Sequence, residues 1–447
     1  MSDKPDYKPI VERRQTWREY QAHLNGPKKA RQRSVKLVRF ILLGVILAGG
    51  LYFIGNRLSS LTPKPDPEAR PTTLAGQTDN MVAGKIRKTD VHILIDDKAF
   101  INRNDPQFTF DYEGRPFTVQ TSLDIPLQNR LLQAMDRANS RYVAVVAMVP
   151  DTGRILALAS YDKTGTLGNP CTSGKFPAAS IFKIVTAAAA VEQCGYTARS
   201  PMKFNGYKHT LYKSQLKKSS NRYTNTISFK DSFAQSVNPV FGKIGFLYLG
   251  KAQLEAYGAA FGFNRIPEFE IPCAPSRLTI ADKPYHWAEI ASGFNNQTTL
   301  SPLHGAALAA VPLNQGRLVE PTIVDRIVDN EGKVFYRNEP TFAGRAVSAE
   351  TAQIVATLME TTVKSGTCRK AFRGSKRDKV LSNLRIGGKT GSIYDKGHTT
   401  RFDWFVGFAH EKQGRGEMAV SVLVAHEEYI GKRASEYARM AFKHYFK

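Results

Sequence analysis

The chain has 447 residues, enough for about two or three domains. Its 63 Lys and Arg outnumber its 39 Asp and Glu, and the net charge of +24 suits anionic surroundings such as nucleic acid, anionic lipid or a cell envelope. No nucleic-acid-binding motif accompanies this charge, and the nine His and four Cys show neither Cys-x-x-Cys nor His-Glu-x-x-His spacing. We therefore expect no nucleic acid partner, no metal and no cofactor.

A strongly basic N-terminus precedes an apolar run. Residues 1–39 contain eleven Lys or Arg against four acidic residues, whereas Phe40 to Ile54 carries no charge. With Leu37 and Val38, this run approaches the roughly 17 to 20 residues that span a bilayer, and the positive charge before it places the N-terminus in the cytoplasm. The run ends without a small-x-small cleavage site, which favours a retained anchor over a cleaved signal peptide.

These features predict the order of domains. Residues 1–36 form a basic cytoplasmic tail, and residues 37–54 form a single-pass anchor in the lipid bilayer of the inner (cytoplasmic) membrane. Residues 55–116 form a linker and a small juxtamembrane module, which is too short to be an enzyme. The chemistry is therefore expected in residues 117–447, on the periplasmic or extracytoplasmic side of the membrane.

The juxtamembrane part has little periodicity. Ser59 to Met81 is rich in Pro, Thr, Asp and Gly, which is typical of a flexible or extended linker. The apolar stretches Val91 to Ile95 and Phe108 to Tyr112 are predicted as short strands.

The periodicity of residues 117–447 predicts strands at both ends of the domain and helices between them. This order favours one antiparallel sheet covered by helices, together with an all-helical lobe, rather than alternating strand and helix units. The predicted strands are 118–124 (an extended lead), 142–149, 155–160, 385–390, 404–409 and 418–425, and the predicted helices are 126–138, 181–191, 231–249, 252–263, 302–313, 349–363 and 433–445.

Ser180 and Lys183 lie at the start of the apolar helix predicted over residues 181–191, with Pro177 expected in its first turn. Residues three apart share a helix face, so the amine of Lys183 can reach the hydroxyl of Ser180. Burial lowers the pKa of a lysine, and a neutral amine can take the proton that makes a serine nucleophilic. The positive field of the helix N-terminus favours the oxyanion of acyl transfer.

Two further patterns complete a candidate site. Ser236-Val-Asn238 lies in an apolar stretch predicted as helical, where a second hydroxyl can relay a proton and an amide can bind a peptide group. Lys389-Thr-Gly-Ser392 follows a strand-like segment. The cation of Lys389 and the hydroxyls of this pattern can hold a carboxylate, and its glycine allows close approach of the backbone.

Each pattern is weak by itself, because each has a second copy in polar surroundings. The site copies differ in lying within apolar, periodic segments, where a charged side chain must find a partner. The other copies are Ser200-x-x-Lys203, Ser214-x-x-Lys217, Ser219-x-Asn221 and Lys163-Thr-Gly-Thr166. The Lys-rich stretch 202–223, which contains two of them, is most simply interpreted as a solvated loop, and the alternative is a patch that binds an anionic polymer.

The three patterns, in this order and separated by 56 and 153 residues, resemble the D,D-transpeptidase domain of the penicillin-binding proteins over about residues 117–447. The resemblance implies the α/β (α+β) fold of the serine β-lactamases and transpeptidases. Supporting segments are Thr121 to Gln128, Val145 to Gly153, Ser301-Pro-Leu-His304 and Trp404 to Ala409.

The resemblance implies roles for the site residues. Ser180 would attack the carbonyl between the two terminal D-alanines of a peptidoglycan stem peptide, with Lys183 as general base and Ser236 as proton relay. The acyl-enzyme would then pass to an amine of a neighbouring stem, and β-lactams would acylate Ser180. The implied catalytic residues are Ser180, Lys183, Ser236, Asn238 and Lys389; Thr390, Gly391 and Ser392 would bind the substrate, Asn238 its peptide amide, and the backbone amides of Ser180 and Ser392 the oxyanion.

The chain departs from the bifunctional members of this family. Only the 62 residues 55–116 are available where those proteins carry a glycosyltransferase domain. The resemblance therefore implies a monofunctional, class B-like protein with a membrane glycosyltransferase or other wall-synthesis proteins as partners.

Several alternatives stay open at the level of sequence. A D,D-carboxypeptidase would share every catalytic residue and use water as acceptor. A class D-like β-lactamase would use a carbamylated Lys183, and a β-lactam sensor or scaffold would need no turnover. The stem-peptide chemistry, the oligomeric state and a role in division or elongation are equally open. So is the state of Cys171, Cys194, Cys273 and Cys368, which could form one or two disulfides or be free buried thiols.

Overall fold

The computed structural model describes residues 87–447. The predicted tail (1–36), anchor (37–54) and linker (59–81) lie outside the described residues. Among the helices of residues 87–447, none combines the length and the apolar character that crossing a membrane requires.

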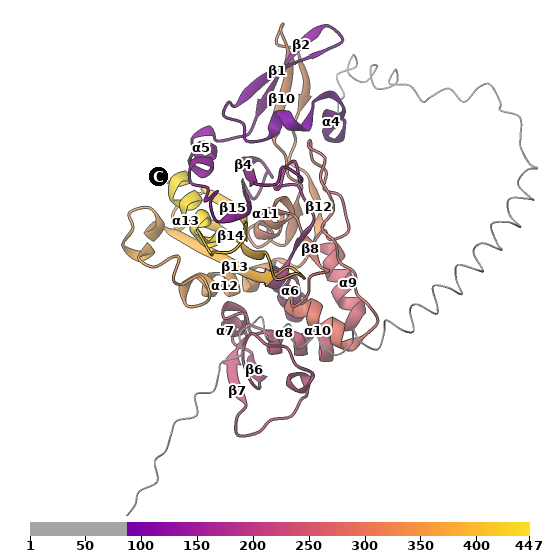
Figure 1. Cartoon of the computed structure of the whole chain (residues 1–447), viewed down its shortest axis with the longest axis vertical. Helices are drawn as coiled ribbons and strands as arrows, with labels where there is room; N and C mark the ends of the chain where they lie inside the picture. The colour runs from indigo at the N-terminus through magenta and orange to yellow at the C-terminus, as the bar shows by residue number, and fades with distance from the viewer. Residues whose placement is uncertain (1–86) are drawn as a thin grey trace, which may run out of the picture. The chain divides into compact units, whose positions relative to one another are not determined.

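A five-stranded antiparallel sheet lies at the centre of the structure (Figure 1). Its strand order is β13-β14-β15-β3-β4, so strands from both ends of the domain lie side by side, as the sequence predicted. The strands are β3 (Ser140–Met148), β4 (Ile155–Asp162), β13 (Leu384–Tyr394), β14 (Arg401–Glu411) and β15 (Glu417–His426).

The sheet is buried on both faces. In β3, Val143 and Val145 belong to one apolar cluster, whereas Ala144 and Val146 belong to another, because successive side chains of a strand point to opposite faces. The first cluster includes side chains of α5 (Ile125–Gln133) and α13 (Ala434–Tyr445), and the second includes those of α6 (Lys183–Cys194) and α11 (Pro302–Ala310).

A second lobe follows α6 in the chain and is mainly helical. It also carries a two-stranded ribbon of β6 and β7, so the prediction of an all-helical lobe was wrong in this detail. Alternate residues of β6 are buried, which is the burial pattern of a strand on a surface. The elements are β6 (Pro201–Phe204), β7 (Asn225–Ser228), α7 (Phe229–Ala234), α8 (Asn238–Ile244), a π-helical turn (Gly245–Leu249), α9 (Gly250–Ala260) and α10 (Pro284–Ser292), with α12 (Ala349–Lys364) packed between α7 and β13.

A smaller four-stranded sheet has the order β1-β2-β10-β11. β1 (Gln107–Tyr112) confirms the strand predicted at Phe108 to Tyr112, and β2 (Arg115–Thr121) pairs with β10 (Val324–Asp329). Strands from the predicted juxtamembrane module (55–116) and from the predicted domain that follows it (117–447) thus share one sheet. β11 spans Val334–Arg337.

The strand predicted at Val91 to Ile95 was wrong, because Val91–Leu94 forms the short helix α4. Val91 and Ile95 are buried while His92 and Ile93 are exposed, so the buried residues recur four apart, which is the helical period. The helix predicted over 126–138 ends at Gln133. The remaining elements are β5 (Phe176–Pro177) paired with β8 (Thr299–Leu300), β9 (Arg317–Val319) paired with β12 (Phe342–Arg345), and the 3-10 turns 88–90, 97–100, 179–182, 213–216, 375–377 and 381–383.

The four cysteines, all in the described part of the chain, are free. Cys171 and Cys368 are buried, and burial raises the pKa of the Cys368 thiol to about 12. A thiol in such surroundings is inert, so these two side chains act as small core residues.

Candidate active site

Ser180 lies in the 3-10 turn Ala179–Phe182 that leads into α6. Pro177, predicted in the first helical turn, instead pairs with β8 as a strand residue, and its carbonyl accepts a hydrogen bond from Trp404 Nε1 at 2.9 Å. Ala179 has a φ of 49°, a left-handed conformation that is costly for a residue with a Cβ atom. Backbone strain of this kind, held by the surrounding structure, clusters at functional sites.

Lys183 is fully buried, and its Nζ lies 2.8 Å from Ser180 Oγ. The same nitrogen donates to Asn238 Oδ1 at 2.8 Å and to the carbonyl of Ser292 at 2.5 Å. Burial, together with the nearby charge of Lys389, holds the pKa of Lys183 well below its usual range. A neutral amine has two hydrogens for the two carbonyl oxygens and one lone pair for the Ser180 hydroxyl, so the arrangement fits a base acting on Ser180.

Ser236 does not lie within a continuous helix, contrary to the prediction. It joins α7 to α8 with a φ of 55°. The physical reason is Pro239. In an uninterrupted helix its ring would clash with the carbonyl of residue 235, whereas a proline is tolerated in the first turn of a helix, where Pro239 lies in α8. The break turns the Ser236 hydroxyl toward Ser180, at 3.0 Å between the two Oγ atoms.

Lys389 completes a row of polar contacts. Its Nζ donates to Ser236 Oγ at 3.0 Å, so Lys389, Ser236, Ser180 and Lys183 form one continuous sequence of hydrogen bonds, which we call the polar chain. Lys389 is fully buried, and burial lowers its pKa to about 7. Within residues 87–447 no carboxylate forms an ion pair with it, so an anionic ligand would stabilise its charged form.

Asn238 connects the polar chain to the loop that follows β6. Its Oδ1 accepts from Lys183, its Nδ2 donates to the carbonyl of His209 at 3.0 Å, and its backbone N–H donates to the carbonyl of Lys208 at 2.6 Å. In this structure the amide therefore holds the base and the adjoining loop in place.

The remaining predicted residues lie on β13, the edge strand of the central sheet. An added Cβ at Gly391 would lie 3.3 Å from Ala179 Cβ, so the strand passes close beside the Ser180 turn. Thr390 Oγ1 is 2.6 Å from Thr367 Oγ1, and Ser392 Oγ accepts from Arg401 Nε at 2.9 Å. An edge strand presents backbone groups that can pair with an extended peptide.

Some neighbours of the site were missed by the sequence analysis. Ser292 and Gly293 come from the end of α10, His209 from the loop after β6, Thr367 from the loop after α12, and Arg401 from β14. These residues share no spacing pattern with Ser180, because only the tertiary fold brings their segments together. Pro239 was the one signal in the sequence that could have predicted the break at Ser236.

Gly293 supports the strained turn before Ser180. It caps α10 with a φ of 65°, and an added Cβ would lie 1.9 Å from the carbonyl oxygen of Ala179 and 2.9 Å from Ser180 N. We expect Gly293→Ala to lower the rate of acylation at Ser180 at least about tenfold, because the turn must move. The measurement is the rate of labelling by a fluorescent penicillin.

Gly195→Ala is the matched control for this change. Gly195 caps α6 with a φ of 64° and has no atom within 4 Å of an added Cβ. It should lose about 1–2 kcal/mol of stability from backbone strain alone and keep its acylation rate. Equal labelling rates in the two variants would contradict a supporting role for Gly293.

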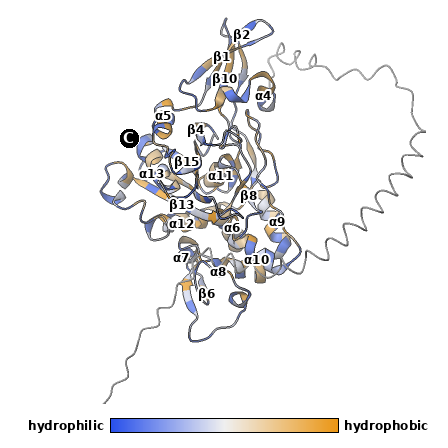
Figure 2. Cartoon of the chain, in the orientation of Figure 1, coloured by the Kyte–Doolittle hydropathy of each residue, from blue (hydrophilic) through white to orange (hydrophobic). Residues whose placement is uncertain are grey.

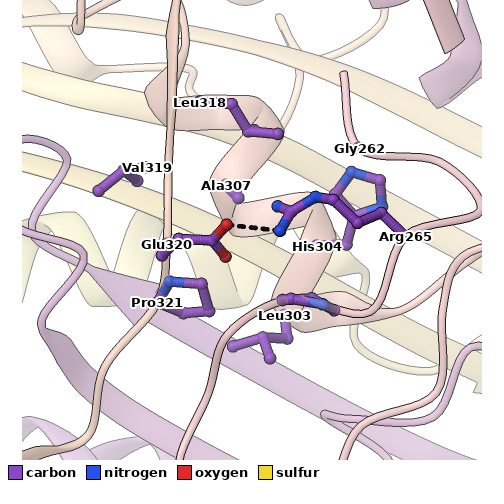
Figure 3. A pocket seen from close by; sticks show the side chains of 10 residues that line it. Gly262, Arg265, Leu303, His304, Ala307, Leu318, Val319, Glu320 and Pro321 are labelled. Atoms are coloured by element: carbon purple, nitrogen blue, oxygen red, sulfur yellow. Dashed lines mark hydrogen bonds and ion pairs between the residues drawn. The ribbon is translucent and has the colours of Figure 1, made fainter. Parts of the chain in front are cut away.

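A small pocket between α11, β9 and the loop after α9 holds a second group of polar side chains (Figure 3). Arg265 Nη1 pairs with Glu320 Oε1 at 2.5 Å, and His304 Nε2 is 2.7 Å from the carbonyl of Phe261. Burial lowers the pKa of His304 to about 4, so its ring is neutral and donates to that carbonyl. These contacts tie the loop to α11 and give no nucleophile or base.

Comparison with known proteins gives one family. Residues 143–445 match the family described as penicillin binding protein transpeptidase domain. The chain is 26% identical to peptidoglycan D,D-transpeptidase PbpA of Mycolicibacterium smegmatis, over 85% of this chain and 83% of that protein. It is 28% identical to penicillin-binding protein 1A of Neisseria lactamica, over 59% of this chain and 30% of that protein.

Solved structures share the fold. Penicillin-binding protein A from Mycobacterium tuberculosis superposes with a TM-score of 0.61 at 21% identity, covering 87% of this chain and 90% of that one. Its imipenem acyl-enzyme complex gives a TM-score of 0.61 at 22% identity, covering 86% and 89%. The D,D-transpeptidase domain of a peptidoglycan glycosyltransferase from Eggerthella lenta gives 0.60 at 23% identity, covering 73% and 82%. The predicted transpeptidase-like α/β fold is thus confirmed.

Proposed function

Since the chain belongs to the penicillin-binding protein transpeptidase family, we propose that it is a peptidoglycan D,D-transpeptidase that binds penicillin and cross-links stem peptides through an acyl-enzyme on Ser180. The observation that supports this assignment most is the polar chain, which joins a nucleophile to a buried amine on each side. The D,D-transpeptidase relatives support the same reaction.

Acylation would begin with the Ser180 hydroxyl. As Ser180 Oγ attacks the carbonyl between the two D-alanines, its proton passes to Lys183 Nζ. The tetrahedral oxyanion would be stabilised by the backbone amides of Ser180 and Ser392 and by the N-terminal field of the helix. The peptide bond then breaks, the leaving D-alanine nitrogen takes a proton through Ser236, and an ester to Ser180 remains.

Substrate binding would use the β13 edge. Lys389, with the hydroxyls of Thr390 and Ser392, would hold the terminal carboxylate, and Gly391 allows the stem peptide to approach the Ser180 turn. The amine of a neighbouring stem then attacks the ester, returns the Ser180 hydroxyl and forms the cross-link. A β-lactam presents a carbonyl and a carboxylate in a similar arrangement, and would acylate Ser180 without a departing amine.

The choice of acceptor separates a transpeptidase from a carboxypeptidase, and it is tested directly with the full chain. Uncross-linked peptidoglycan strands are incubated with the protein, digested with a muramidase and separated by mass. We expect cross-linked dimers, formed with loss of one D-alanine each. Monomers that have lost D-alanine without any dimer would instead identify a carboxypeptidase.

The pH dependence of acylation follows from the two lysines. Lys183 must be neutral to act as a base, so the second-order rate of acylation by benzylpenicillin should rise as the pH passes its lowered pKa. Lys389 must be charged to hold the carboxylate, so the rate should fall again as Lys389 loses its proton near about pH 7. Labelling rates measured between about pH 5 and 10 check this bell-shaped profile.

The methyl ester of benzylpenicillin is the matched control for the falling limb. It carries no carboxylate, so its acylation rate should be lower but should not fall when Lys389 loses its proton. A fall of the same size with the ester would contradict the assignment of Lys389 to the carboxylate.

We propose the domain order and location on the sequence alone. The basic tail (1–36) is cytoplasmic, residues 37–54 anchor the chain in the inner membrane, residues 55–116 are linker and juxtamembrane module, and residues 117–447 act outside. Residues 55–116 are too few for a glycosyltransferase domain between the anchor and the transpeptidase domain, so we propose that the protein works beside a membrane glycosyltransferase. Accessibility of an epitope tag fused to the tail, probed with an antibody in intact cells, tests the orientation.

A further inference from the structure

Two basic segments adjoin the site. Residues 203–222 contain six Lys or Arg and no acidic residue, and residues 369–379 contain six Lys or Arg and one acidic residue, Asp378. All twelve cations are exposed, and the first segment is hydrophilic along most of its length (Figure 2). Surfaces usually intersperse both signs of charge, so two segments of one sign suggest an anionic ligand.

Both segments are hydrogen-bonded to residues of the site. In the first, the carbonyls of Lys208 and His209 accept from Asn238. The second begins just after Thr367, whose hydroxyl contacts Thr390 and whose backbone N–H donates to the carbonyl of Ala234 at the end of α7. Both segments are therefore connected to the site by one hydrogen-bonded residue or loop each, through Asn238 and Thr390.

The charges are available to a ligand. Among the described residues, none of the twelve cations forms an ion pair, and the one acidic side chain, Asp378, is paired with Lys443 of α13. Some cations lie over aromatic rings instead: Lys218 Nζ is 5.7 Å from the ring centre of Tyr248, and the Arg222 guanidinium is 4.7 Å from that of Tyr223.

Exposed tyrosines accompany the first segment. Tyr207 is 79% exposed, Tyr223 68% and Tyr248 52%. A tyrosine ring offers a flat apolar face and a polar tip, which suits the face of a sugar ring, whereas lysines and arginines suit carboxylates. This combination fits a glycan that carries acidic peptides better than it fits a bare polyanion.

The first segment lies far from the start of the described structure. The segment lies between β6 and β7, at the opposite end of the described structure from α4 (Figure 1). Because α4 lies near the start of the described residues, residues 203–222 are far from the point where the chain enters the described structure.

We propose that residues 203–222 and 369–379 bind an uncross-linked peptidoglycan strand, with the cations on the carboxylates of its stem peptides and the tyrosines on its sugars. This inference rests on the proposed function, because it describes how a strand is held beside the Ser180 site during cross-linking.

The test is binding of soluble, fluorescently labelled, uncross-linked peptidoglycan strands to the full chain in uncharged detergent, followed by anisotropy. The variant combines Lys213→Gln, Lys217→Gln, Lys218→Gln and Arg222→Gln, whose side chains are exposed. Its Kd should rise about tenfold or more, and wild-type binding should weaken with added salt. Strands stripped of stem peptides by an amidase should bind more weakly than intact strands.

The matched control removes four exposed cations from the N-terminal sheet and its surroundings, by Lys98→Gln, Arg115→Gln, Lys333→Gln and Arg337→Gln. It has the same net charge as the test variant, and its Kd should stay within about twofold of the wild-type value. Equal weakening in both variants would overturn the proposal, because only net charge would then matter.

Two further readouts separate the alternatives. If vesicles of anionic lipid bind in a way that the four test substitutions abolish, while strands do not bind, the surface is a membrane contact and the proposal is wrong. Labelling by penicillin is measured on the same samples and should be unchanged in the test variant. Strand binding without any penicillin labelling of the wild type would refute the proposed function while leaving the binding surface in place.

Discussion

Ser180→Ala is expected to abolish cross-linking of peptidoglycan strands and covalent labelling by penicillin. The hydroxyl is the nucleophile in the proposed mechanism, because it lies 2.8 Å from Lys183 Nζ, the amine proposed as the base. Removing a serine nucleophile lowers turnover by roughly 10⁴- to 10⁶-fold. The measurement is the amount of cross-linked dimer formed per minute by the full chain.

Ser200→Ala is the control, because Ser200 begins another Ser-x-x-Lys pattern and lies immediately before β6. Among residues 87–447 the Ser200 hydroxyl hydrogen-bonds with Thr197 alone, so its loss should leave cross-linking unchanged. Residual activity of Ser180→Ala comparable with that of Ser200→Ala would exclude Ser180 as the nucleophile.

Lys183→Met should lower the acylation rate by about 10² to 10⁴, the usual contribution of a general base. Methionine keeps the length and apolar stem of the side chain, so packing around the start of α6 is largely retained. The carbonyl of Ser292 and Oδ1 of Asn238 lose a donor, which should cost about 1–3 kcal/mol of stability. Acylation is followed with benzylpenicillin, and stability by thermal unfolding.

The loss of stability must be separated from the loss of chemistry. Acylation is therefore measured well below the unfolding temperature of Lys183→Met, and Lys175→Met, at an exposed lysine shortly before β5, serves as the control. The Lys183 variant should also lose the rising limb of the pH profile. A variant that kept both its rate and that limb would show that another group removes the proton.

The contacts of the site were predictable where the two residues lie close together in the sequence. Ser180 and Lys183 are three residues apart on one helical turn, and the structure places Lys183 Nζ 2.8 Å from Ser180 Oγ. The antiparallel sheet was predictable for a similar reason, since β3 and β15 are continuous apolar runs with strand-like residues. In both cases the pattern lies within one segment of the chain.

Features that depend on tertiary contacts were not predictable. The left-handed turn at Ala179 is held by Gly293, which is more than a hundred residues later in the chain. The short helix α4 was mistaken for a strand, because the five residues Val91 to Ile95, four of them apolar, are too few to show a clear period. The helix break at Ser236 could have been found from Pro239, since a proline inside a helical pattern marks its interruption.

The most direct test of the account is the intact mass of the full chain in detergent after brief exposure to benzylpenicillin, followed over hours with Ser180→Ala alongside. We predict that the wild type gains the mass of one penicillin and keeps it, whereas the alanine variant gains nothing. An adduct that disappears within seconds while penicillin is consumed would identify a β-lactamase. The absence of any adduct on the wild type would contradict the enzymatic account and leave a sensor or scaffold.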